Sequence, residues 1–154
     1  MNNSFRKTLD ELGIELPPPI DPLGSYRTVV KSGDQLLVSG LGPFRNGKPV
    51  IGLVGDDVSL EDAQEAARLT MLLILACVDD AYGLEHVDQC VRLTVYVRAK
   101  EPFIDHPKVA NGASDLLLAL FGPDRLPARS AIGVRTLPMG IPVEIDSVFQ
   151  LKRP

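Results

Sequence analysis

The segment from Cys90 to Arg98 alternates between apolar and polar side chains, and this alternation constrains the fold more than any other feature of the chain. One face carries the apolar residues Val91, Leu93, Val95 and Val97. The other face carries Arg92, Thr94, Tyr96 and Arg98. A repeat of two residues is the signature of a β-strand with one buried face. The chain is therefore expected to build a sheet that packs one face on a core and leaves the other face polar.

Helical patterns lie on both sides of this strand in the sequence. Ser59, with Asp62 three residues later, approximates a capping box, and the helix is predicted to end near Gly83. Its centre, Met71 to Val78, is apolar on every side, which indicates burial against more than one neighbour. A second helix is predicted over Lys108 to Phe121.

The remaining strands are predicted from β-rich runs bounded by turn residues. The runs are Tyr26 to Lys31, Gln35 to Ser39, Arg129 to Thr136 and Val143 to Leu151. Between them, Leu41 to Asp57 is predicted to be a long loop with a brief strand at Val50-Ile51. The order ββαβαββ predicts an α+β fold with two helices on one face of a mixed sheet. Thr94, Tyr96 and Gly133 are expected on the other face, where an oligomer could cover them.

A length of 154 residues predicts a single domain over 1–154. Its start, about residues 1–23, is expected to hold a short helix from Ser4 to Leu12 and then an arm rich in proline. Neither a signal peptide nor a membrane-spanning run is found, so a cytoplasmic location is expected. The net charge of −4 argues against nucleic acid as a partner. Cys77 and Cys90 lack metal-ligand spacing and are expected to be buried thiols, so no metal or cofactor is predicted.

Two residues near the end of the chain form the candidate reaction site. Arg129 stands at the mouth of one predicted strand, and Glu144 stands inside the next among apolar neighbours. A guanidinium can hold a carboxylate through two parallel hydrogen bonds, and a carboxyl in apolar company is suited to proton transfer. The alternatives are a surface ion pair for Arg129 and an ordinary outward-facing strand residue for Glu144.

Four stretches carry a family resemblance over nearly the whole chain. They are Gly24-Ser25-Tyr26, Val38-Ser39-Gly40, Ala110-Asn111-Gly112, and Pro127-Ala128-Arg129-Ser130 with Val143-Glu144-Ile145. In order and spacing the sequence resembles the RidA family, also called YjgF/YER057c/UK114 and, in older usage, endoribonuclease L-PSP. The resemblance implies a chorismate-mutase-like fold and a homotrimer with active sites in the clefts between subunits.

The same resemblance implies a reaction and roles for individual residues. The reaction is hydrolytic deamination of reactive enamine and imine acids, such as 2-iminopropanoate and 2-iminobutanoate, without a cofactor. Arg129 would bind the substrate carboxylate and Glu144 would position or activate water. Tyr26 would line the pocket, while Ser39, Gly40 and Asn111 would supply polar and backbone contacts. The alternative for Ser39 and Gly40 is a simple turn, and for Asn111 a helix cap.

The chain departs from family members with deaminase activity at two positions. Those members usually have cysteine where this chain has Ala131, which would still lie in the pocket, and glutamine or a similar residue where it has Leu41. The loop from Leu41 to Asp57 differs as well, and the N-terminal arm and the Gly-Ile-Pro-Val-Glu-Ile-Asp ending indicate a divergent branch. These departures motivate a second hypothesis, a module that binds a 2-oxo acid or similar carboxylate without turnover. A ribonuclease or translation inhibitor is a third, which the acidic composition disfavours.

Overall fold

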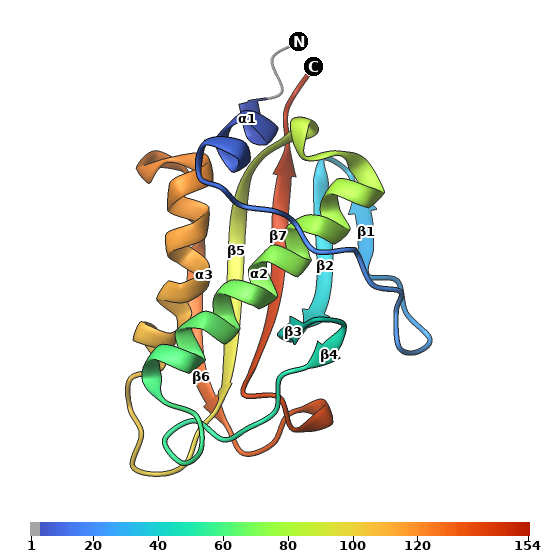
Figure 1. The fold of residues 1–154 in the computed structure, drawn as a ribbon. Helices are drawn as coiled ribbons and strands as arrows, with labels where there is room; N and C mark the ends of the chain where they lie inside the picture. The colour runs from blue at the N-terminus through green and yellow to red at the C-terminus, as the bar shows by residue number, and fades with distance from the viewer. Residues whose placement is uncertain (1–3) are drawn as a thin grey trace.

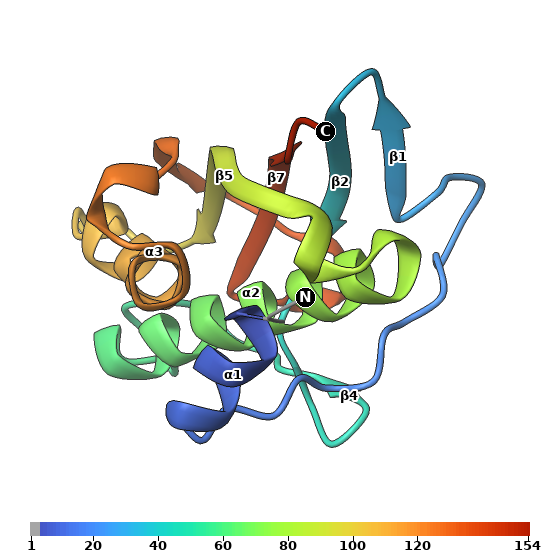
Figure 2. The ribbon, with the colours of Figure 1, turned by 90° about the horizontal axis from the view of Figure 1, so that it is seen from above.

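The computed structural model describes residues 4–154 and shows a five-stranded sheet with helices on one face (Figures 1 and 2). The strands lie in the order β1-β2-β7-β5-β6, where β5 and β6 are parallel and the other neighbours are antiparallel. Their bounds are β1 Val29–Ser32, β2 Gln35–Leu41, β5 Val87–Arg98, β6 Ala128–Val134 and β7 Val143–Leu151. The predicted α+β fold with a mixed sheet is confirmed.

Two long helices, α2 (Leu60–Tyr82) and α3 (His106–Phe121), form the layer that covers the sheet (Figure 2). The cap predicted for α2 is present, since the Ser59 side chain accepts a hydrogen bond from the Asp62 backbone N–H. The apolar centre of α2 is buried because the sheet lies on one side of it, while α3 and the N-terminal segment lie on others.

The alternation predicted for β5 holds over Leu93, Val95 and Val97, which are fully buried under the helices. It fails at Val91, which was expected on the same buried face. The register of β5 against β7 shifts between Cys90 and Arg92, so Val91 is the extra residue of a β-bulge and is only half-buried, while Cys90 points into the core.

The predicted loop of Leu41 to Asp57 contains a small hairpin, β3 (Phe44–Arg45) with β4 (Lys48–Pro49). The strand predicted at Val50-Ile51 was wrong, because both residues lie after the hairpin. Asn46 and Gly47 form its turn, both with positive φ, and an Asn-Gly pair is the strongest sequence signal for such a turn.

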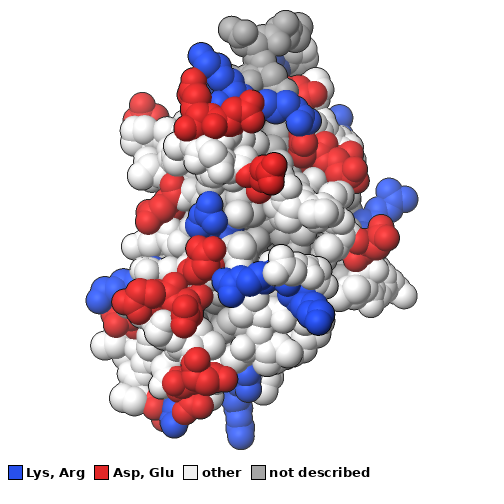
Figure 3. All heavy atoms as spheres, viewed as in Figure 1, with Lys and Arg blue, Asp and Glu red and all other residues white. Residues whose placement is uncertain are grey.

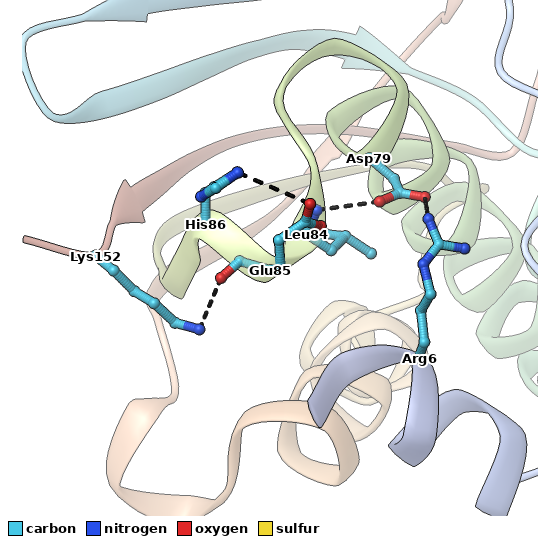
Figure 4. Close-up of polar contacts among 6 residues, drawn as sticks. All are labelled: Arg6, Asp79, Leu84, Glu85, His86 and Lys152. Atoms are coloured by element: carbon cyan, nitrogen blue, oxygen red, sulfur yellow. Dashed lines mark hydrogen bonds and ion pairs between the residues drawn. The ribbon is translucent and has the colours of Figure 1, made fainter. Parts of the chain in front are cut away.

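The N-terminal segment begins with α1 (Ser4–Glu11), close to the predicted Ser4–Leu12, and then runs outside α2 to the β1 edge of the sheet (Figures 1 and 2). Figure 4 shows its anchor at the end of α2: Arg6 donates to Asp79 Oδ2 at 3.1 Å, and Asp79 Oδ1 accepts from the Leu84 N–H. Here η1 (Leu84–His86) leads into β5, and Lys152 donates to the Glu85 carbonyl.

The other short helices are η2 (Pro123–Arg125) before β6 and η3 (Pro138–Gly140) before β7. No helix over residues 4–154 has the length and apolar character that crossing a membrane requires. On the helical face drawn in Figure 3, acidic side chains alternate with basic ones instead of leaving a continuous basic surface.

Candidate functional site

The structure divides the predicted site residues between two clusters on opposite faces of the sheet. In the pairing of β5 with β6, Arg129 lies beside Leu93, whose side chain points toward the helices. In the pairing of β5 with β7, Glu144 lies beside Tyr96 on the other face. The strand β5 also separates them laterally by about 10 Å of sheet. One chain therefore does not bring Arg129 and Glu144 together.

Arg129 is held in a fixed orientation by acceptors on α3. Its Nη1 donates to Asn111 Oδ1 at 2.7 Å and to Ser114 Oγ at 3.0 Å, and its Nη2 donates to the Pro107 carbonyl at 3.2 Å. Asn111 lies inside α3, whose N-cap is Asp105, so the alternative of a capping role was wrong. Asn111 orients the guanidinium instead, and the Arg129 cluster consists of Arg129, Asn111, Ser114 and Ala131.

Ser114 was missed by the sequence analysis, although it stands three residues after Asn111 and so shares a face of the helix with it. Ala131 follows Arg129 along the same face of β6 and is half-buried. Gly133 comes next on this face, and the His106 ring packs against it. A β-carbon at Gly133 would stand only 2.6 Å from His106 Nε2. Gly133 was expected on the opposite face, and this was wrong because it pairs with the buried Val97.

The second cluster surrounds a cavity of about 490 Å³ where β2 ends and β7 begins. We call it the Glu144 cavity. Its lining includes four of the predicted site residues, Tyr26, Ser39, Gly40 and Glu144. The rest of the lining is largely apolar and was not predicted: Ile20, Leu23, Leu41, Gly42, Phe44, Pro138, Met139 and Ile141.

Glu144 is half-buried in this cavity without a hydrogen-bond or ion-pair partner among residues 4–154. Burial raises the pKa of its carboxyl group, and the negative charge of Asp146 raises the pKa further. Asp146 itself accepts a hydrogen bond from the Tyr96 hydroxyl at 2.9 Å, which raises the pKa of Tyr96. A carboxylate without a partner and with a raised pKa is suited to exchange a proton with water or substrate.

Gly40 provides the room for this carboxylate. A β-carbon there would stand 3.0 Å from the Glu144 carboxyl carbon and Oε2. Ser39 and Gly40 lie opposite Asp146 alone, because Val38 pairs with Ser147 and Leu41 pairs with Ile145. They form a β-bulge in β2, so the reading of a simple turn was wrong.

The hydroxyl groups of Tyr26 and Ser39 each make one hydrogen bond to the backbone. Tyr26 Oη accepts from the Leu23 N–H at 3.2 Å, which leaves the phenolic proton available to a ligand. Ser39 Oγ donates to the Arg27 carbonyl at 2.8 Å, so it can only accept from a ligand. The prediction that Tyr26 begins the first strand was wrong, because β1 begins at Val29.

The other candidate groups lie away from both clusters. Cys77 and Cys90 are buried free thiols, as expected, and burial raises the pKa of Cys90 to about 12. His86 lies in η1 beside Glu85, where the chain passes from α2 to β5 (Figure 4). Over residues 4–154, no three His, Cys, Asp or Glu side chains are grouped as metal ligands.

Comparisons with known proteins agree with this fold. The sequence model of the YjgF/chorismate mutase-like family matches residues 7–142. This family is described as one of putative endoribonucleases. The protein TCP17 of Trypanosoma cruzi is 39% identical over 146 residues, which cover 93% of this chain and 91% of that protein.

Two crystal structures of bacterial proteins superpose over nearly the whole chain. Atu1372 of Agrobacterium tumefaciens, described as of unknown function, is 35% identical with a TM-score of 0.88 and covers 97% of this chain and 94% of its own. A Shewanella oneidensis protein is 31% identical with a TM-score of 0.91 and covers 97% and 100%. E. coli TdcF with bound serine has the same fold at 20% identity and a TM-score of 0.65, covering 90% and 96%.

Proposed function

Because the chain belongs to the YjgF/chorismate mutase-like family, we propose that it hydrolyses reactive 2-imino acids and their enamine tautomers without a cofactor. Water adds to the imine carbon to give a carbinolamine, the C–N bond then breaks, and the products are a 2-oxo acid and ammonia. The observation that carries the proposal is the pair of clusters: a preorganised guanidinium, and a carboxylate with a raised pKa over a cavity.

Arg129 would bind the substrate carboxylate. Asn111, Ser114 and Pro107 fix its guanidinium plane, so little rotational freedom remains to be lost when a ligand binds. The charge of the ligand carboxylate would then be neutralised next to the electrophilic carbon. Ala131, on the same face of β6, is the small side chain that follows Arg129 there.

Glu144 would take a proton from the attacking water and return it to the departing nitrogen. Its raised pKa brings the carboxyl group nearer to neutrality, where both protonation states are accessible. The Tyr26 phenol could donate to the substrate, while Ser39 could accept from it. The binding of serine by TdcF, a protein of the same fold, supports a small amino-acid-like ligand.

The two clusters would meet between chains. Since Arg129 and Glu144 lie on opposite faces of one sheet, the proposed reaction needs Arg129 from one copy and Glu144 from another. The outward face of the sheet carries exposed apolar side chains, Val30, Leu37 and Ile132, which a second copy would cover. A cyclic homotrimer is the assembly that we propose.

The test measures ammonia release from 2-iminopropanoate generated in solution, above the spontaneous rate. We expect Arg129→Lys to lower kcat/KM about a hundredfold, because a lysine cannot reproduce two charge-assisted hydrogen bonds. Arg45→Lys, on the exposed strand β3, is the matched control and should leave the rate unchanged. A wild-type protein that accelerates ammonia release neither from this imine nor from one with a larger side chain would refute the proposal.

A binding module without turnover is the second candidate, favoured by Ala131 in the position that cysteine occupies in deaminases of this family. Calorimetry with pyruvate separates the two functions. Binding that depends on Arg129, together with no acceleration of imine hydrolysis, would favour the module.

A further inference from the structure

The Glu144 cavity has an apolar wall made by three segments distant in sequence. The arm contributes Ile20 and Leu23, the β2 end and β3 contribute Leu41 and Phe44, and η3 contributes Met139. Leu23 is 69% exposed and Met139 is 46% exposed. Large apolar side chains that line a cavity and remain open to solvent gain free energy when an apolar group covers them.

The polar part of the cavity is small. It consists of the Glu144 carboxylate, the hydroxyl groups of Tyr26 and Ser39, and the backbone at Gly40. A few polar groups in an otherwise apolar cavity of this volume are typical of a small-molecule site. An apolar protein surface packed directly on the cavity would bury the carboxylate without a partner, which is unfavourable. A ligand with one polar end and one apolar end satisfies both parts.

The wall residues are held in place by hydrogen bonds. The Leu23 N–H donates to Tyr26 Oη at 3.2 Å and so closes the turn that carries Leu23. On the other side, Arg98 Nη1 donates to the carbonyls of Gly52 and Gly140 at 3.1 and 3.3 Å. Gly140 follows Met139 in η3, so these hydrogen bonds hold the backbone that carries Met139. The wall is therefore formed before a ligand arrives.

Resting on the function proposed above, we propose that the substrates are 2-imino acids and enamines whose side chain is apolar and at least as large as isobutyl. Leu23 and Met139 select these substrates by contacting the side chain. A methyl group, as in 2-iminopropanoate, would leave most of a cavity of about 490 Å³ unfilled. Each methylene that fills an apolar pocket favours a substrate by roughly tenfold or more.

The experiment compares imines produced in solution from leucine and from alanine by an amino-acid oxidase. We expect the wild-type kcat/KM to be at least about tenfold higher for the leucine-derived imine. Leu23→Ser and Met139→Asn should each lower this leucine-to-alanine ratio about tenfold. Asparagine is chosen because it tolerates the positive φ of 57° at Met139. Leu118→Ser, at an exposed leucine on α3 outside the cavity, is the control and should keep the wild-type ratio.

Equal rates for the two imines, or ratios that do not change in Leu23→Ser and Met139→Asn, would overturn the selection. If neither imine is hydrolysed, the proposed function fails and the selection is tested by calorimetry with 4-methyl-2-oxopentanoate and pyruvate. Tighter binding of the larger acid that is lost in Leu23→Ser supports the selection. Equal affinities, or no binding of either acid, contradict it.

Discussion

At the scale of the residue, Gly40 determines where the Glu144 carboxylate can lie. In Gly40→Ala, the new methyl group would meet the carboxyl group at 3.0 Å and displace it by some tenths of an ångström. We expect imine hydrolysis to fall at least about tenfold, because misplacing a reacting group by about 1 Å can cost a hundredfold. Melting temperature should change little, since Gly40 is exposed.

Gly24→Ala is the matched control for this change. A β-carbon at Gly24 would meet only Tyr26, at ordinary contact distances of 3.4 Å and above. Full activity in Gly40→Ala would show that the position of the Glu144 carboxylate does not limit the rate.

A second prediction concerns Glu144 and pH. Because its pKa is raised in the folded state, the folded protein binds the proton more tightly than the unfolded chain does. The resulting stabilisation is complete below pH 4.5, the ordinary value, and is lost as the pH rises through the raised pKa. Glu144→Gln should therefore be more stable than the wild type at pH 7, and this difference should disappear near pH 4.

Urea unfolding of both proteins at several pH values measures this difference. Asp80→Asn, at an exposed aspartate of α2 that lies outside both clusters, provides the comparison. A Glu144→Gln variant that is destabilised at pH 7 would contradict the raised pKa. The same variant should lose imine hydrolysis about 10²- to 10⁴-fold, the usual contribution of a general base.

Sequence patterns nominate Arg129 and Glu144 as candidates but do not place them relative to each other. The type of a residue and its neighbours in the chain are visible in a short stretch of sequence, and these were the grounds for choosing both residues. The face of a strand is set by its partner, and β6 has no apolar alternation that would reveal its inward side: Arg129, Ala131 and Gly133 face the helices, while Ser130 and Ile132 face away.

At the scale of the element, Gly112 sets the distance between α2 and α3. On helix propensity alone, Gly112→Ala should stabilise the protein by about 1 kcal/mol. A β-carbon there would, however, come within 2.0 Å of the Gln64 carbonyl oxygen, which belongs to the backbone of α2 and cannot move aside as a side chain could. We therefore expect net destabilisation of about 1–3 kcal/mol.

The midpoint and slope of urea unfolding measure this effect. Asp115→Ala, at an exposed position on the same helix, reports the gain in propensity without the clash. If Gly112→Ala were the more stable of the two variants, the helices would not be as closely packed as the structure has them.

Elements were predicted well where a local chemical signal marks their ends. The Ser59 cap and Gly83, which has a φ of 78°, bound α2 within a residue of the prediction. The bulges at Val91 and at Ser39-Gly40 carry no such signal, because they result from the fit between two strands. The β3–β4 hairpin did have a local signal, the Asn46-Gly47 pair in its turn. The many glycines and prolines around this pair led to the prediction of a loop instead.

At the scale of the whole molecule, the opposite faces of Arg129 and Glu144 predict complementation between two inactive proteins. Arg129→Ala and Glu144→Gln should each lose activity, yet mixing them by joint refolding should restore it. In a cyclic trimer that draws Arg129 from one subunit and Glu144 from the next, each mixed ring contains one intact site. Random mixing should then give about a quarter of the wild-type activity.

Mixing each variant with itself is the control and should restore nothing. No recovery in rings that are shown to be mixed would mean that each site lies within one chain.

The sequence predicts such an assembly only through family resemblance, because interfaces between copies depend on how distant strands present their outer faces. Val30, Leu37 and Ile132, exposed on three strands, come to lie on the same face of the sheet only after it has formed.

The bulge at Ser39 and Gly40 can be lost without changing the register of the sheet. It allows Val38 and Leu41 to point into the core together, although their spacing would place them on opposite faces of a regular strand. Deleting Ser39 or Gly40 would leave these two residues two positions apart, so a regular strand would keep both in the core and keep Leu41 opposite Ile145. Relatives that lack one residue here are therefore expected to keep the fold and to differ in the backbone that this segment presents to Glu144.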